Sequence, residues 1–184
     1  MANAKDIRAI EMEERGGALG SAILRNINTK SITGTAETSM IPTSLLGSAI
    51  LTPEDLSVVG RTFKIFGECE LTTSAASAGT GTIRIKLGST TILTSAAETL
   101  PNNLSSVRAI FEIIATITDS GKIRISGGTV FSNTTGLGGT LIRKLATTTD
   151  QIITITSNQT LDVTYQFSGA SNTLVVREIN IIRY

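Results

Sequence analysis

The sequence has no histidine and no tryptophan, a single cysteine, and aromatic residues at only 4% of its positions. Without histidine, the chain lacks the commonest general base, the base of a Ser-His-Asp triad and the usual nitrogen ligand of zinc. Cys69 cannot form an internal disulfide, so assembly in a reducing compartment is allowed. We therefore expect no catalytic residue, no metal ligand, no cofactor and no enzymatic activity.

Strong net charge and long apolar runs are also missing. The formal net charge is +1, which argues against a nucleic-acid partner and against an anionic membrane surface. The longest apolar run, residues 109–117, is interrupted by Glu112 and Thr116 and is far shorter than the roughly 20 residues of a membrane helix. Residues 1–6 are polar and do not resemble the start of a signal peptide. We expect no membrane partner.

Residues 1–30 differ in composition and pattern from the rest of the chain. Charged residues dominate the first half, Ile7 and Ile10 give a thin helical stripe, and Gly16-Gly17 ends it. We predict an arm, extended or partly helical, that attaches the chain to a larger assembly; the alternative is a solvated tail without a role. The predicted anchoring residues are Ile7, Arg8, Ile10, Glu11 and Leu19.

Residues 31–184 read as short strands separated by glycine-rich and polar turns, with no helix predicted after residue 17. In residues 61–72 and 82–87, apolar and polar side chains alternate with a period of two. Eight to ten such strands, about ten residues apart, predict an all-β, antiparallel two-sheet sandwich of the jelly-roll type. The predicted core contains Phe63, Ile65, Leu71, Ile83, Ile85, Leu87, Phe111 and Ile113, and the predicted solvent-facing set is Lys64, Glu68, Arg84 and Lys86.

Two predicted strands, residues 107–118 and 173–184, are apolar on both faces. A two-layer sandwich covers only one face of each sheet, so a second apolar face indicates contact with another subunit. We therefore predict an oligomer. Its interface is assigned to Ile110, Ile114, Ile179, Ile181 and Tyr184.

Four segments then carry a family resemblance: 31–38 (SITGTAET), 59–65 (VGRTFKI), 81–90 (GTIRIKLGST) and 171–177 (SNTLVVR). In this order they resemble a jelly-roll domain of structural proteins in tailed bacteriophages, among them head decoration proteins, head fibres and tail fibres. The resemblance covers about residues 31–184. It implies a homotrimer within the virion, assembled in the bacterial host cytoplasm, whose partner is the major capsid protein or another virion protein.

Three functions remain open at this point. The first is a capsid decoration or head-fibre subunit fixed by its arm, and the second is a tail-associated receptor-binding domain for a host surface glycan. The third, a glycan-cleaving enzyme, would use Glu68 and Glu70, which lie about 7 Å apart on one strand face. With Lys64 nearby, this acidic pair is typical of a solvated face. Cys69 shares the inward face of the same strand and is predicted to be a buried, inert thiol.

Overall fold

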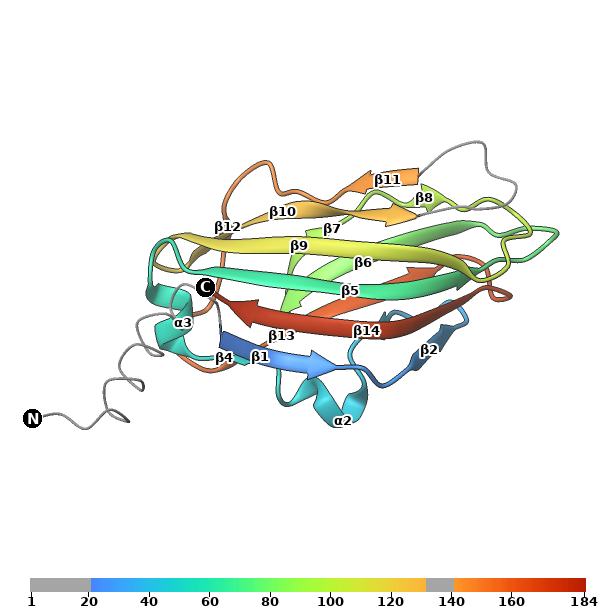
Figure 1. Ribbon diagram of the computed structural model, residues 1–184. Helices are drawn as coiled ribbons and strands as arrows, with labels where there is room; N and C mark the ends of the chain where they lie inside the picture. Colours follow the sequence, from blue (N-terminus) through green and yellow to red (C-terminus); the bar gives the residue numbers. More distant parts are fainter. Residues whose placement is uncertain (1–20, 132–140) are drawn as a thin grey trace, which may run out of the picture.

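Two antiparallel sheets pack face to face in the computed structural model, which describes residues 21–131 and 141–184 (Figure 1). The larger sheet has eight strands in the order β1-β14-β5-β9-β10-β11, with β2 also on β14 and β12 also on β10. The smaller sheet has six strands in the order β3-β13-β6-β7, with β4 also on β13 and β8 also on β6. The predicted all-β, antiparallel jelly-roll sandwich is confirmed.

The strands of the two sheets are interleaved along the chain. The larger sheet contains β1 (Ser21–Asn26), β2 (Lys30–Thr33), β5 (Thr62–Thr72), β9 (Val107–Asp119), β10 (Lys122–Phe131), β11 (Leu141–Lys144), β12 (Gln151–Ile152) and β14 (Thr173–Arg183). The smaller sheet contains β3 (Thr38–Ser39), β4 (Ile50–Leu51), β6 (Thr80–Leu87), β7 (Thr90–Thr94), β8 (Glu98–Thr99) and β13 (Gln159–Phe167). Every edge is divided between two short strands, and β1, the longest described edge strand, has six residues.

The core lies between the sheets and follows the period-two alternation of the long strands. In β5 and β6 every second residue is buried, and all eight predicted core residues are at most 5% exposed. Tyr165 and Phe167 of β13 meet there edge to face, with ring centroids 4.9 Å apart. The predicted solvent-facing residues lie on the two outer faces. They are partly exposed, and each forms an ion pair. The predicted register of these strands is therefore confirmed.

Strand β14 carries a β-bulge at Arg177, because its register with β5 shifts between Val176 and Glu178. Leu174 and Val176 face the core before the bulge, whereas Ile179 and Ile181 face it afterwards. The assignment of Ile179 and Ile181 to a subunit interface is thus wrong. Both side chains are fully buried within this chain, since the extra residue reverses the alternation on which the assignment rested.

Gly67 of β5 pairs with Ile179, directly after the bulge, and makes room for the bulged backbone. A Cβ atom at this position would lie 2.1 Å from the carbonyl oxygen of Glu178 and 2.7 Å from the ring of Phe111. No side chain fits at such distances without a backbone shift, so the bulge requires glycine here.

Two short helices, α2 (Thr43–Leu46) and α3 (Pro53–Ser57), occur where no helix was predicted. The signal for α3 is present in the sequence: Thr52 is followed by proline at the first helical position and by Asp55 three residues later. Thr52 Oγ1 accepts a hydrogen bond from the backbone N–H of Asp55 at 3.3 Å, and Asp55 Oδ2 accepts one from the backbone N–H of Thr52 at 3.0 Å. This capping box fixes the helix at one end of the sandwich (Figure 1).

Part of the predicted arm belongs to the sandwich. Strand β1 pairs with the end of β14, and Ser21 lies opposite Arg183. Residues 21–26 therefore form an edge strand of the larger sheet. The predicted anchors Ile7, Arg8, Ile10, Glu11 and Leu19 lie outside the described residues.

Candidate interaction surface on the larger sheet

The outer face of the larger sheet presents apolar side chains from its central strands. Ile110 of β9 is 58% exposed, although β9 lies between β5 and β10 and not at an edge. Ile114, Phe66 and Ile182 are half-buried on the same face. Two shallow hollows mark it. One is lined by Ile110, Glu112, Ile114, Gly127 and Gly128, and the other by Arg25, Ile27, Phe66, Glu178, Asn180 and Ile182.

Ion pairs between neighbouring strands run among these apolar residues. Lys64 Nζ of β5 lies 2.8 Å from Glu112 Oε2 of β9, and Arg177 Nη2 of β14 lies 2.8 Å from Glu70 Oε2 of β5. Arg108 of β9 pairs in the same way with Glu68 of β5. We call these six residues the charge lattice. Its three cations and three carboxylates leave the face without net charge at its centre.

The charge lattice shifts the proton affinities of its members. The hydrogen bond to Glu112 raises the pKa of Lys64, and the hydrogen bond from Arg177 lowers the pKa of Glu70. Lys64 also lies over the ring of Phe66, with its Nζ 5.7 Å from the centroid. Glu68 and Glu70, the two carboxylates considered for glycan cleavage, are both ion-pair partners of arginine. This matches the solvated face that was predicted from the nearby Lys64.

Three of the five predicted interface residues remain at the surface. Ile110 and Ile114 lie on the outer face of β9 with Glu112 between them, as predicted, and Tyr184, 45% exposed, follows the end of β14. Sequence analysis did not assign Phe66 and Ile182 to this surface. Alternation along β5 places Phe66 outward, but Ile182 faces outward only because of the bulge at Arg177.

The outer face of the smaller sheet is organised differently, around Glu37. Its carboxylate accepts a hydrogen bond from Thr164 Oγ1 at 2.8 Å and pairs with Arg84 at 3.3 Å and Lys86 at 3.2 Å. The bond from Thr164, with help from Lys86 and Arg84 and against the effect of burial, lowers the pKa of Glu37. Arg84 also donates to Gln166 Oε1 at 2.9 Å. This polar cluster joins β6, β13 and the segment before β3.

Asp162 lies on the same face of β13 as the polar cluster. Its Oδ1 accepts a hydrogen bond from Ser39 Oγ at 2.6 Å. Burial raises the pKa of Asp162, although the bonds from Ser39 and from the backbone of Val163 act in the other direction.

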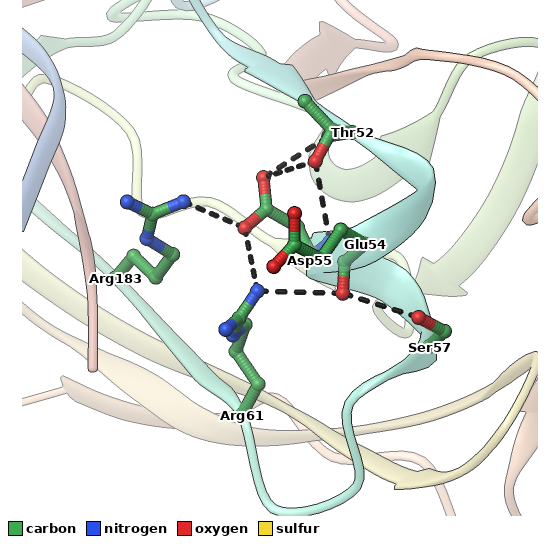
Figure 2. A network of polar contacts seen from close by, with 6 residues as sticks. All are labelled: Thr52, Glu54, Asp55, Ser57, Arg61 and Arg183. Atoms are coloured by element: carbon green, nitrogen blue, oxygen red, sulfur yellow. Dashed lines mark hydrogen bonds and ion pairs between the residues drawn. The ribbon is translucent and has the colours of Figure 1, made fainter.

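At the end of the sandwich, Asp55 of α3 holds two arginines (Figure 2). Asp55 is 3% exposed, and its Oδ1 accepts hydrogen bonds from Arg61 Nη1 at 2.9 Å and Arg183 Nη1 at 2.7 Å. Burial alone would raise the pKa of Asp55, but the hydrogen bonds from Thr52 and Arg183 lower it below its ordinary value. We call this group the Asp55 clamp. It fastens α3 to the end of β14.

Cys69, metal-binding clusters and membrane-spanning helices remain to be considered for the described residues. Cys69 is buried as predicted, and burial raises the pKa of its thiol to about 12, which keeps it protonated. Within residues 21–131 and 141–184, no three side chains of His, Cys, Asp or Glu gather as a metal site. No helix in these ranges has the length and apolar character needed to cross a membrane.

No family model and no curated protein matches the chain. Among solved structures, the lectin from Bauhinia forficata in complex with GalNAc is 11% identical, with a TM-score of 0.38 over 89% of this chain and 99% of that one. The CBM2 module of the evolved Dit of Lactobacillus casei BL23 phage J-1 is 10% identical, with a TM-score of 0.29 over 84% and 68%. Botulinum neurotoxin type C, in a study of its interaction with two ganglioside molecules, is 11% identical, with a TM-score of 0.28 over 89% and 41%. Likenesses at this level carry no argument about function.

Proposed function

We propose that this chain is a non-catalytic structural subunit of a tailed-bacteriophage virion, a trimeric capsid decoration or head-fibre protein. The observation that supports it is the outer face of the larger sheet. Exposed Ile110 and its apolar neighbours lie there among paired charges, and apolar side chains grouped on an exposed face are typical of a surface that meets another protein. The order of strand and turn motifs from residue 31 onward supports the same proposal.

The proposed attachment to the particle uses the first 20 residues, and the major capsid protein or another virion protein is the partner. The position of β1 decides where a truncation that tests this attachment should end. A deletion that extends past residue 20 would remove β1, which pairs with β14, and would confuse loss of attachment with damage to the sheet. The informative truncation therefore ends at residue 20.

The test adds purified protein to particles that lack it and measures the bound copies by mass spectrometry and by imaging. We expect the full chain to decorate the head in many copies, and the chain without residues 1–20 to bind weakly while retaining its oligomeric mass. Equal decoration by both chains would place attachment on the jelly roll. A handful of copies confined to the tail would contradict a decoration role.

A second candidate is recognition of a host surface glycan by a tail-associated domain. The polar cluster on the smaller sheet favours it, because Glu37, Arg84, Lys86 and Gln166 gather the donors and acceptors that sugar hydroxyls require. A glycan array would test it. Binding by the wild type that is lost in Arg84→Ala and kept in Arg124→Ala, a variant on the larger sheet, would support this candidate. Absence of binding across a broad array would oppose it.

A further inference from the structure

We propose that a second copy of this chain covers the outer face of the larger sheet, with Ile110 near the centre of the contact. This inference rests on the proposed function and deepens it, because it names a surface through which copies of the chain associate. The first argument is the position of Ile110. Its side chain is 58% exposed on a strand that has neighbours on both sides, so no described strand of the sheet covers it.

The second argument is the shape of this face. Ile110 and Ile114 border one shallow hollow, and Phe66 and Ile182 border another on β5 and β14. A projecting apolar side chain and apolar hollows on one surface allow identical copies to fit each other. Covering these four side chains would remove apolar surface from water, which is the main driving force of stable association.

The third argument is charge. Lys64, Arg108 and Arg177 are each paired within the chain to Glu112, Glu68 and Glu70 respectively. The face therefore attracts neither a strongly acidic nor a strongly basic partner. An identical copy brings the same neutral lattice, so two such faces can approach without net repulsion.

The fourth argument is size. Strand β5 has 11 residues and β9 has 13, and the face spans β14, β5, β9 and β10. At about 3.4 Å per residue and about 4.8 Å between strands, its footprint is roughly 700–800 Å². A standard protein interface buries about 800 Å² on each partner, so this face is large enough for a contact with one copy.

The experiment compares two exposed isoleucines by light scattering at micromolar concentration. Ile110→Lys places a charge at the centre of the proposed contact, whereas Ile152→Lys alters an isoleucine that is 79% exposed on β12. We expect wild type and Ile152→Lys to share one oligomeric mass, and Ile110→Lys to associate about 10- to 100-fold more weakly. Circular dichroism and the unfolding midpoint identify any variant that fails to fold, in which case Ile110→Ser replaces it.

A wild-type monomer, or an Ile110→Lys oligomer as strong as wild type, would overturn the inference. Failure of the proposed function can be distinguished from failure of this inference, because the virion role is tested on particles and the association in solution. A protein that associates through Ile110 but is absent from virions would leave the inference standing and reject the virion role. A protein found on virions whose association ignores Ile110→Lys would do the reverse.

Discussion

The Asp55 clamp and the charge lattice use the same side-chain types for different purposes. In the clamp, a carboxylate that is 3% exposed holds Arg61 and Arg183 and caps α3. In the lattice, the carboxylate of Glu112 is 54% exposed and pairs with one lysine. Charges withdrawn from water hold parts of the chain together, because a buried carboxylate without partners is costly. Charges left in water contribute little to stability and instead set the character of a surface.

The bulge at Arg177 separates these two networks. Arg177 and Arg183 are six residues apart and would share one face of a regular strand. With the extra residue, Arg177 pairs with Glu70 on the outer face, whereas Arg183 lies opposite core-facing Phe63 and reaches Asp55. One irregularity in β14 thus assigns one arginine to the surface and one to the clamp.

The largest difference between the networks should appear on deletion of the central carboxylate. We expect Asp55→Ala to lower the free energy of unfolding by about 2–4 kcal/mol, because two partly covered arginines lose their partner and the capping box of α3 loses the bond to the Asp55 carboxylate. Denaturant unfolding measures this loss. The matched variant Glu112→Ala should change stability by less than about 1 kcal/mol. Equal losses would show that burial does not distinguish the two networks.

The bulge that separates the networks depends on Gly67. Gly67→Ala should cost about 1–3 kcal/mol, because its Cβ would overlap the carbonyl oxygen of Glu178 and force the backbone to move. Gly47→Ala is the control, since a Cβ there meets nothing within 4 Å, and its effect should stay below about 1 kcal/mol. Unfolding midpoints of both variants test the prediction. A Gly67→Ala protein as stable as wild type would contradict the close approach.

The clamp should also show itself in the pH dependence of stability. The pKa of Asp55 is lowered on folding, so its contribution is present above the unfolded-state pKa of about 3.9 and is lost as the pH falls through the folded-state pKa. We therefore expect the stability difference between wild type and Asp55→Asn to be largest at neutral pH and to shrink below about pH 4. Urea unfolding across this range measures it.

Asp162 provides a control of opposite sign. Its pKa is raised by burial, so its contribution is present below the unfolded-state pKa and is lost as the pH rises through the folded-state pKa. Asp162→Asn keeps an oxygen that can accept from Ser39 and should be at least as stable as wild type at neutral pH. If the stability differences from wild type depended on pH in the same way for Asp55→Asn and Asp162→Asn, the opposite pKa directions assigned to Asp55 and Asp162 would be contradicted.

The smallest effect belongs to the charge lattice itself. Lys64→Ala removes the pair with Glu112 and the contact with the ring of Phe66, and should cost less than about 1 kcal/mol. Phe111→Ala, on the inner face of β9, is the comparison variant and should lower the free energy of unfolding by about 3–5 kcal/mol. Comparable shifts of the unfolding midpoint would mean that the inner and outer faces are exchanged.

Local alternation was enough to predict the fold and much of the core. Phe63, Ile65 and Leu71 in β5 and Ile83 and Ile85 in β6 are buried as predicted, because a regular strand with one covered face must alternate. The same rule failed at Ile179 and Ile181, since a bulge depends on the partner strand. The one available signal was Gly67, a glycine within an alternating strand, which is typical of a close backbone approach.

The charge networks were less accessible to prediction. Asp55 and Arg183 are 128 positions apart, and nothing local to either residue indicates that they meet. The capping box at Thr52 and Asp55 could have predicted α3, but not the two arginines that close on it. On the candidate surface, alternation along β9 correctly placed Ile110 and Ile114 outward. The ion pairs around them depend on the order of strands in the sheet, which the sequence pattern does not specify.

The divided edges of the two sheets bear on solubility. A long, flat edge strand offers a row of free backbone groups on which another chain can add, and repetition of that step builds a fibril. Here β1 and β2 share one edge of the larger sheet and β11 and β12 share the other, while β3 with β4 and β7 with β8 do the same in the smaller sheet. No described edge strand is therefore longer than six residues. Copies of this chain that lie side by side offer each other only short edge strands for pairing. They can therefore be concentrated without growing into one continuous sheet.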